Sequence, residues 1–466
     1  MRIYPQSDIR HTGSPGLDVR RTALEILNTV GQNRRTLDAI MQVVFDQTEM
    51  WSRRDRALLN ALVYGVLRWR GRLDYVIKYQ SKIRFARIDP NVLNILRIGL
   101  FQIAYLSRVP STAAVNTSVE LVKSTGAPWV VGYVNAVLRK AAKNYHNVVY
   151  PDSLADPIES LAARKSFPRW LIRRWLKKNT IENIEALCDA INTIPAITLR
   201  TNTLITSRDA LIKALTMEAE EIFPTPYAPE GVSITNLLKP IPEWVAFQKG
   251  WFQIQDEAAQ LVTLLLNPRP GEAILDACAG LGGKTGHIAQ HMKNKGTIVA
   301  LDKNGERLKQ LHSQMQRLAV SIVSSRKHDL NFPPEKTETG TFDRILLDAP
   351  CSGLGVLRRN PDAKWNLTEK QLKRHRQRQL GFLNNLAHLV KPDGILVYVV
   401  CSNEQEENED VVKDFLNVHP EFAQDHRSGA LSLKTEDLIT RQGYLKTSPF
   451  PDSMDGFFSA RFKRIR

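Results

Sequence analysis

An aspartate and a cysteine stand three positions apart at the point where an apolar segment of the chain ends. The stretch FDRILLDAPCSGLG (Phe342–Gly355) contains the apolar run Ile345–Leu347, which is the pattern of a short strand buried on both faces. The proline and glycines that follow remove a backbone donor and permit unusual backbone angles, so the strand must end there. Ligands of open α/β sheets bind at the carboxyl ends of strands. Asp348 and Cys351 are therefore candidates for catalysis, and the alternative is a strand-to-loop turn with a semi-buried thiol.

A glycine-rich turn, LDACAGLGGKTG (Leu275–Gly286), follows an earlier apolar segment and precedes a helical pattern. Glycines there let backbone N–H groups approach a ligand. A phosphate-binding P-loop would need glycine at position 278, which is Cys278, and the glycine spacing does not fit GxGxxG. The next strand ends in Asp302, which is well placed to accept hydrogen bonds from ribose hydroxyls. This combination is typical of class I S-adenosylmethionine methyltransferases, and a Rossmann-like domain for another nucleotide is the alternative.

The composition indicates a large, basic, cytosolic protein. The chain has 466 residues, which predicts about three domains, and a formal net charge of +16, which favours a polyanionic partner such as nucleic acid. The four cysteines form no CxxC pair, so we expect neither a zinc site nor disulfides and predict no metal. No signal segment or bilayer-length apolar run is found, so we expect a soluble cytoplasmic protein without a membrane partner.

The periodicity of apolar residues divides the chain into four parts. Residues 1–16 are expected to be a flexible lead-in. Residues 17–146 carry apolar stripes at helical spacing, with separate helices expected over 55–72 and 73–82, and predict an all-helical domain. Residues 155–255 mix helical and strand patterns and predict a small α+β module. Residues 256–466 alternate strands with helices, which predicts an α/β domain with a mostly parallel sheet.

The helical part resembles the NusB-like RNA-binding domain. The resemblance is carried by RRDRALLNALVYGVLRWRGRLDYVI, ILRIGLFQIAYL, and VNTSVELVKSTG followed by VNAVLRK. It implies that basic side chains of this part meet RNA phosphates, and a solvated helix face is the alternative for each of them. These side chains are Arg53, Arg54, Arg56, Arg68, Arg70 and Arg72.

With DAPCSGLG and the later VYVVCS (Val397–Ser402), the chain resembles the RNA 5-methylcytosine methyltransferases of the RsmB (Sun/Fmu) family. FPRWLIRRW, GWFQIQDEAAQL, LRRNPDAKW, SNEQEENED and DGFFSARF extend the likeness over about residues 17–464. It implies a Rossmann-like class I S-adenosylmethionine-dependent methyltransferase domain preceded by the all-α NusB-like domain and the α+β module. It also implies methyl transfer to carbon 5 of a cytosine in small-subunit (16S) rRNA.

Carbon 5 of cytosine is a poor nucleophile, and a thiolate that adds to carbon 6 activates it. By the resemblance, Cys401 is that nucleophile and Cys351 assists proton removal and release. Asp348 matches the carboxylate at the cytosine's polar edge, and Lys284 matches the lysine of the loop, where it could also lower the pKa of a neighbouring thiol. The same resemblance assigns S-adenosyl-L-methionine to Cys278, Ala279, Gly280, Leu281, Gly282, Gly283, Lys284, Asp302, Asp329 and Asp348.

The sequence departs from the family pattern at three positions. The loop usually reads CAAPGGKT and here has Gly280 and Leu281, which makes it less rigid and could weaken cofactor affinity. Val400 stands where the nucleophile motif usually has threonine. Both cysteines, the lysine and the aspartates remain, so we expect an active enzyme.

The expected partner is small-subunit rRNA before subunit assembly, with no DNA, and the expected state is a monomer. A basic segment beside the catalytic loop is predicted to contact the RNA backbone. Its members are Arg358, Arg359, Lys364, Lys370, Lys373, Arg374, Arg376 and Arg378, with Trp365 among them. The alternatives are a tRNA cytosine-5 methyltransferase and a non-catalytic RNA-binding assembly factor that retains the cofactor fold. A P-loop NTPase is disfavoured by Cys278.

Overall fold

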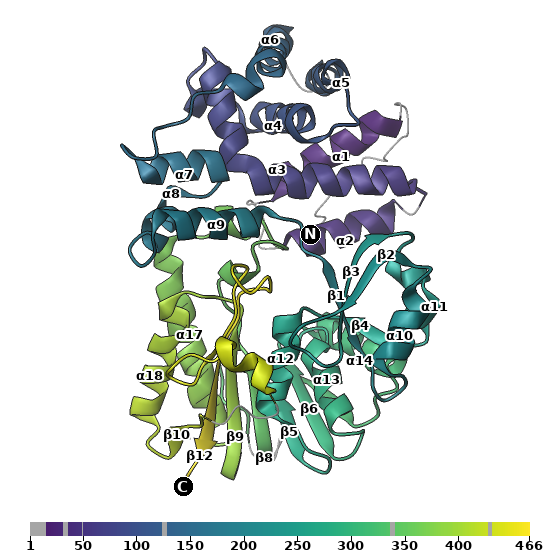
Figure 1. Cartoon of the computed structure of the whole chain (residues 1–466), viewed down its shortest axis with the longest axis vertical. Helices are drawn as coiled ribbons and strands as arrows, with labels where there is room; N and C mark the ends of the chain where they lie inside the picture. Colours follow the sequence, from purple (N-terminus) through teal and green to yellow (C-terminus); the bar gives the residue numbers. More distant parts are fainter. Residues whose placement is uncertain (1–14, 31–35, 49, 124–127, 336–340, 427–430) are drawn as a thin grey trace. The chain divides into compact units, whose positions relative to one another are not determined.

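The structure, a computed structural model, describes residues 15–30, 36–48, 50–123, 128–335, 341–426 and 431–466 (Figure 1). The contacts divide the chain into two compact units. One comprises residues 1–192 together with 360–367, and the other comprises residues 193–359 and 368–466. The expected lead-in over residues 1–14 lies outside the described part, and Pro15 and Gly16 already belong to the first helix.

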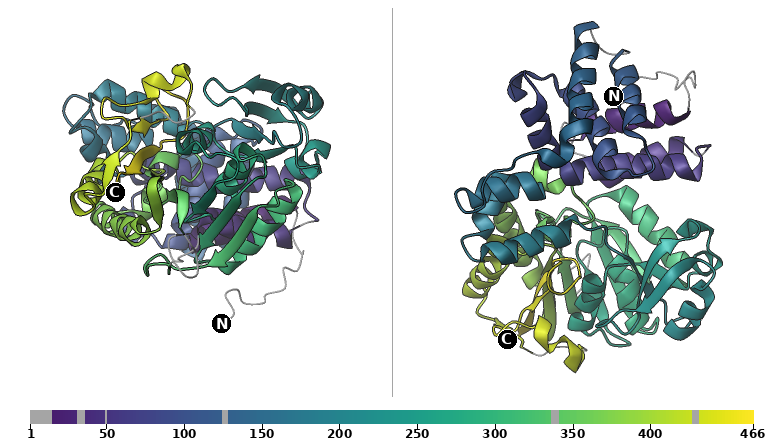
Figure 2. Two further views of the ribbon diagram at one scale, coloured as in Figure 1. Left: turned by 90° about the horizontal axis from the view of Figure 1, so that it is seen from below. Right: turned by 45° about the horizontal axis from the view of Figure 1, so that its top comes forward.

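The first unit, called here the helical unit, is all-α in its described residues, as predicted (Figures 1 and 2). Its helices pack apolar stripes into one core that includes Leu59, Leu62, Ile95 and Leu138. The helices are α1 (Pro15–Thr29), α2 (Leu37–Gln47), α3 (Arg53–Gln80), α4 (Pro90–Tyr105), α5 (Ser111–Lys123), α6 (Pro128–Asn144), α7 (Pro157–Lys165), α8 (Arg169–Trp175), α9 (Ile181–Asn192) and α16 (Ala363–Asn366).

Helix α3 corrects one prediction, because the two helices expected over 55–72 and 73–82 form a single helix of 28 residues. Ser52 caps its first turn by accepting a hydrogen bond from the Asp55 backbone N–H at 3.2 Å. Gly71 does not end the helix. A side-chain carbon at Gly71 would lie 3.0 Å from a Trp365 ring atom and 3.2 Å from the Ser166 Cα atom. Close packing against the side of α3 therefore accounts for this glycine.

Residues 360–367 follow the loop that carries Cys351 and fold with the helical unit. The buried Lys364 ammonium donates hydrogen bonds to the Arg68 carbonyl at 2.8 Å and to the Asn192 amide oxygen at 3.3 Å. It also lies 4.1 Å from the centroid of the Phe167 ring. The Trp365 indole N–H donates to the Leu67 carbonyl at 2.6 Å. The prediction that Lys364 contacts RNA is therefore wrong, and the same holds for Arg68, which is buried in α3.

The second unit, called here the catalytic unit, begins with a four-stranded antiparallel sheet of order β2-β3-β1-β4. Helices α10 (Arg208–Leu215) and α11 (Val245–Gln248) accompany it around the buried Trp244 and Phe252. The strands are β1 (Ile197–Thr201), β2 (Ala219–Pro224), β3 (Gly231–Leu237) and β4 (Phe252–Ile254). An α+β module is present as predicted, but residues 155–192 of its expected range of 155–255 belong to the helical unit, and β2 and β4 were not predicted. Exposed Glu220 and Glu221 weaken the apolar alternation of β2, and β4 has only three residues.

The larger sheet has the path β10-β12-β9-β8-β5-β6-β7, with β11 paired to β12. Strands β9 to β7 along this path are parallel and β12 pairs antiparallel with β9, so the predicted α/β class is confirmed. The strands are β5 (Ala273–Asp276), β6 (Thr297–Asp302), β7 (Val323–Lys327), β8 (Phe342–Asp348), β9 (Val390–Val400), β10 (Phe422–Gln424), β11 (Leu445–Lys446) and β12 (Phe458–Arg464).

Helices cover the two faces of this sheet, as Figure 1 shows for α12 and α13 on one side and α17 and α18 on the other. Alternate residues of β8 enter different cores: Leu346 joins one cluster with α12 and α13, while Ile345 and Leu347 join another with α17 and α18. The helices are α12 (Glu257–Leu266), α13 (Gly283–His291), α14 (Gly305–Arg317), α17 (Glu369–Ala387) and α18 (Glu409–Val418). Across the described part of the chain, every helix is too short or too polar to cross a bilayer.

We predict that Trp365→Ala lowers the free energy of unfolding of the helical unit by about 2–4 kcal/mol, because a large ring packed on its core and the hydrogen bond to Leu67 are both lost. Thermal unfolding of the full chain measures this, with Trp129→Ala as the matched control because Trp129 is 68% exposed. Equal unfolding temperatures for the two variants would contradict the anchoring role of residues 360–367.

Candidate active site

The chemistry-bearing residues gather at the carboxyl edge of the larger sheet. Asp276, Asp302 and Asp348 are the last residues of β5, β6 and β8, and Cys401 directly follows β9. The chain runs from β5 outward to β6 and β7 and then returns to place β8 and β9 on the other side of β5. This reversal creates a crevice at the strand ends, where open α/β sheets bind ligands.

A cavity of about 470 Å³ lies at this edge. All the predicted site residues except Gly282 line it, from both the glycine-rich loop and the strand ends: Cys278, Ala279, Gly280, Leu281, Gly283, Lys284, Asp302, Asp329, Asp348, Cys351 and Cys401. Gly282 has a left-handed φ of 83°, and a side-chain carbon there would lie 2.8 Å from Leu311. Its role is to turn the chain into α13 beneath the cavity.

The glycine-rich loop is held by the end of β6. Asp302 accepts a hydrogen bond from the Gly280 N–H at 3.0 Å, and the Gly282 N–H donates to the Ala279 carbonyl at 2.9 Å. Gly280 has a left-handed φ of 56°, and a side-chain carbon built on it meets no atom within 4 Å. Leu281 is 52% exposed beside it. With Gly280 and Leu281 in place of the usual residues, the loop still forms a closed turn, and the space next to the Gly280 Cα atom is open.

Those observations fit an adenosyl cofactor. An acidic side chain at the end of the second strand of a βαβ unit suits ribose hydroxyls, and a glycine with open space above it suits close approach of a ligand to the backbone. His328, Arg307 and Phe382 also line the cavity. Sequence reasoning missed these three, because they come from three separate segments that only the fold brings together.

Lys284 and Asp348 form a salt bridge with the Nζ atom 2.6 Å from the carboxylate oxygen. Burial lowers the pKa of Lys284, but the charge of Asp348 and its hydrogen bond outweigh this effect and raise the pKa above its ordinary value. The Cys401 sulfur interacts with the same ammonium electrostatically. The lysine is therefore a fixed positive charge beside the Cys401 sulfur.

The two cysteines face each other across the ends of β8 and β9, with their Sγ atoms 3.2 Å apart. The hydrogen bond with Cys401, followed by burial, raises the pKa of the Cys351 thiol well above its ordinary value. The carboxylate of Glu407 raises it further. A negative group thus lies near Cys351 and a positive group near Cys401. The raised pKa of Cys351 favours its protonated thiol beside the Cys401 sulfur.

Glu407 holds the loop that carries Cys351. Its buried carboxylate accepts hydrogen bonds from the Ser352 N–H at 2.8 Å and from the Gln379 amide at 3.0 Å. Its backbone carbonyl accepts a hydrogen bond from the buried Tyr398 hydroxyl at 2.6 Å. Sequence reasoning missed Glu407. The only signal for it lies in SNEQEENED, where several acidic residues are adjacent and nothing marks which of them are buried.

The basic segment after Cys351 divides by environment. Arg358 is buried beside Asp455 at 3.2 Å, and Arg359 bridges Asp455 at 2.6 Å and Asp256 at 2.8 Å. The prediction that Arg358 contacts RNA is therefore wrong, because its guanidinium is buried and pairs with Asp455. Arg376 pairs with acidic residues of α18, and Arg378 donates to the Pro350 carbonyl at 3.1 Å. Exposed side chains remain at Lys370, Lys373 and Arg374 on α17.

The fold and the site define a class I S-adenosylmethionine-dependent methyltransferase with paired cysteines. The family model "16S rRNA methyltransferase RsmB/F" matches residues 263–463, the NusB family matches residues 17–143, and the ferredoxin-like domain of RsmF/B-like methyltransferases matches residues 167–239. The chain is 35% identical to "Probable ribosomal RNA small subunit methyltransferase B" of Bacillus subtilis (strain 168), over 96% of this chain and 98% of the relative. The chain therefore belongs to the RsmB/F methyltransferase family.

Solved structures agree with this assignment. The crystal structure of PH0851 is 27% identical and superposes with a TM-score of 0.77, covering 97% of this chain and 99% of that one. A methyltransferase homologue from Pyrococcus horikoshii, also 27% identical, has a TM-score of 0.56 and covers 66% of this chain and 99% of that one. The predicted three-part order of all-α domain, α+β module and Rossmann-like domain is thus confirmed, as is S-adenosyl-L-methionine as the cofactor.

We predict that the buried Asp276 makes the folded chain less stable as the pH rises. Burial, the largest effect, raises the pKa of Asp276 from 3.8 to about 6, although Thr285 donates a hydrogen bond to it at 2.7 Å. An acid that binds its proton more tightly when folded loses stability as the pH rises between those two values. Asp276→Asn, which cannot ionise, should remove this part of the pH dependence. Unfolding temperatures of both proteins between pH 4 and pH 7 test this, and parallel profiles would contradict it.

Proposed function

We propose that this enzyme transfers a methyl group to carbon 5 of a cytosine in 16S rRNA through a covalent bond between Cys401 and the base. The observation that carries the proposal is the pair of thiols 3.2 Å apart at the cavity, one from each of two neighbouring strands. The names of the relatives support RNA of the small ribosomal subunit as the substrate. S-adenosylmethionine supplies the methyl group when it is bound.

Cys401 carries out the first step, which is addition to the base. Its thiolate, favoured by the Lys284 ammonium, adds to carbon 6 of the cytosine and forms a sulfur–carbon bond. The electron pair of the carbon 5–carbon 6 double bond then becomes available at carbon 5, which accepts the methyl group. Asp348, held by Lys284, is placed at the strand end where it could meet the polar edge of the base and stabilise its protonated form.

Cys351 assists the last step, which is release of the methylated base. After transfer, a base takes the proton of carbon 5, the electron pair of that carbon–hydrogen bond restores the carbon 5–carbon 6 double bond, and the sulfur–carbon 6 bond breaks so that Cys401 leaves as a thiolate. Cys351 lies within hydrogen-bond distance of the leaving sulfur and assists both events. A base in a duplex cannot reach this cavity, so the target cytosine is single-stranded or flipped out of its stack.

We predict that Cys401→Ala abolishes methyl transfer, because it removes the sulfur that adds to carbon 6. Cys351→Ala should instead trap the covalent protein–RNA adduct, because bond formation at Cys401 persists while release fails. Transfer from labelled S-adenosylmethionine to total RNA measures the first effect, and denaturing gel electrophoresis detects the adduct. Cys188→Ala is the control, since Cys188 is a buried thiol of the helical unit.

If the adduct accumulates in Cys401→Ala, the two roles are reversed. If the wild-type protein binds RNA but labels none, a non-catalytic assembly role replaces the proposal and the Gly280–Leu281 departure becomes the first suspect. Labelling of tRNA in place of rRNA would identify the substrate as tRNA.

We also predict that deproteinised 16S rRNA is methylated more than about tenfold faster than assembled small subunits. The catalytic cysteines line a cavity, so the base has to leave its surroundings to reach them, and an assembled subunit restrains it. Initial rates on the two substrates at equal RNA concentration test this. Equal rates would show that the enzyme does not require RNA before assembly.

A further inference from the structure

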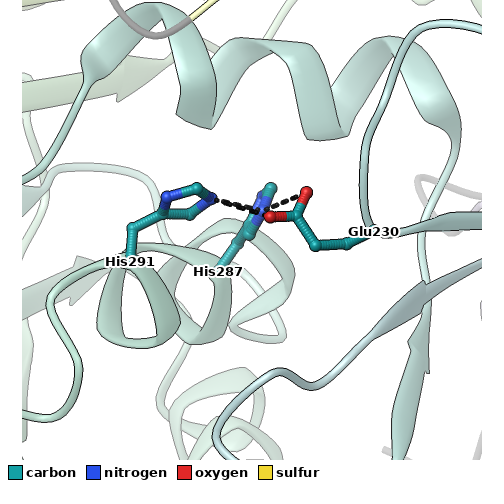
Figure 3. Close-up of side chains that lie close together, drawn as sticks. All are labelled: Glu230, His287 and His291. Atoms are coloured by element: carbon teal, nitrogen blue, oxygen red, sulfur yellow. Dashed lines mark hydrogen bonds and ion pairs between the residues drawn. The ribbon is translucent and has the colours of Figure 1, made fainter. Parts of the chain in front are cut away.

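A glutamate and two histidines form a compact cluster apart from the catalytic cavity (Figure 3). His287 and His291 stand one turn apart on α13, so they share a face of the helix, and Glu230 directly precedes β3. The two Nε2 atoms are 3.2 Å apart. The Glu230 carboxylate directs one oxygen toward each ring, at 3.6 Å from His291 Nε2 and 4.0 Å from His287 Nε2.

Two of these distances, 3.2 and 3.6 Å, are close to those that a divalent metal ion requires, and the third, 4.0 Å, is somewhat longer. Zinc bound tetrahedrally at about 2.0–2.2 Å holds neighbouring ligand atoms about 3.3–3.5 Å apart. The nitrogen and oxygen atoms of the cluster all lie within 4.8 Å of one another. Among the described residues, this is the single group of three or more histidine, cysteine or acidic side chains whose atoms could share an ion.

The protonation states of the cluster also favour a bound cation. Burial lowers the pKa of both imidazoles, and the buried Nδ1 atom of His287 has no hydrogen-bond partner. A single N–H can satisfy the contact between the two Nε2 atoms. The buried Glu230 Oε2 atom has no hydrogen-bond partner. The Glu230 carboxylate and the two imidazoles therefore lie close together, and the N–H groups of the rings cannot satisfy every lone pair among them.

Arg200 is the charged group that opposes a cation here. Its positive charge contributes to the lowered pKa of both histidines. Its guanidinium donates to Gln253, Gln255 and the Gly283 carbonyl, and the negative charge of Glu230 offsets it. Burial raises the pKa of Glu230. A metal ion in contact with this carboxyl group would favour its deprotonated form.

We propose that Glu230, His287 and His291 form a binding site for one divalent ion of the zinc class, with water or the second carboxylate oxygen as a further ligand. None of the three lines the catalytic cavity, so the ion would be structural. It would tie the α+β module, through Glu230, to the helix that carries Lys284 at its first turn. The prediction of no metal rested on cysteine spacing. The signal it left unused is HxxxH in GHIAQHM.

Cobalt titration of the untagged, chelator-treated full chain tests the proposal. We expect about one equivalent of Co²⁺ to bind and to give the visible bands of a four- or five-coordinate ion. Thiolate-to-cobalt charge transfer should be absent, which distinguishes this site from metal bound by Cys351 and Cys401. Zinc at about a hundred times its dissociation constant should raise the unfolding temperature by several degrees.

His291→Gln should lose the cobalt bands and the zinc-induced shift, and it should fold because His291 is partly exposed. Glu230→Gln should weaken binding by at least about tenfold, because it removes the only negative ligand. His312→Gln is the matched control, since His312 is an exposed histidine on α14. The proposal is overturned if wild type binds no cobalt, if binding survives in His291→Gln, or if the spectrum shows thiolate ligation.

Discussion

The contact between the Cys351 and Cys401 sulfur atoms is the constraint on which the catalytic unit depends. Two loops that are 50 residues apart in sequence must place their side chains 3.2 Å apart. The register of β8 and β9, in which Asp348 pairs with Val399, sets the ends of the two strands level. The Ala349 N–H extends the ladder by one more bond to the Val399 carbonyl at 2.9 Å. The apolar runs of both strands, buried on two faces, fix that register because a shift of one residue would reverse every side chain.

Backbone contacts beyond the strands complete this constraint. The Gly355 N–H donates to the Cys401 carbonyl at 3.0 Å, and the Gly456 N–H donates to the Gly355 carbonyl at 2.8 Å. A side-chain carbon at Gly355 would lie 1.9 Å from the Gly456 oxygen, so only glycine allows the three segments to meet. The antiparallel β12 belongs to the same arrangement, because Phe458 pairs with Val400, the residue just before Cys401. The carboxyl-terminal strand therefore helps to position Cys401.

The sequence predicted those parts of the molecule whose signal is local. Apolar periodicity located the helices of the first unit and the strands of the larger sheet, and DAPCSGLG and VYVVCS located the thiols. The wrong and missed predictions have a common cause. Whether a charged side chain is buried depends on the fold, and the local sequence does not reveal it. Lys364 and Arg358 read as exposed cations, although one is buried beneath Phe167 and the other beside Asp455. Glu407 could not be distinguished from its acidic neighbours, and His328, Arg307 and Phe382 enter the site from segments without a motif. The strands β2, β4 and β10 were too short or too polar to give a period.

The segment between β8 and α17 links the two units through anchored side chains. Arg359 ends the part that belongs to the catalytic unit, and its guanidinium is fixed by Asp455 and Asp256. Lys364 and Trp365 lie five and six positions later and are fixed to carbonyls of α3 in the helical unit. Cys351 precedes Arg359 by eight positions, so the loop that carries it is tied at one end to the sheet and leads directly into this link. The chain therefore passes directly from the loop that carries Cys351 into the helical unit, and the side chains at each end of this passage are fixed within their own unit.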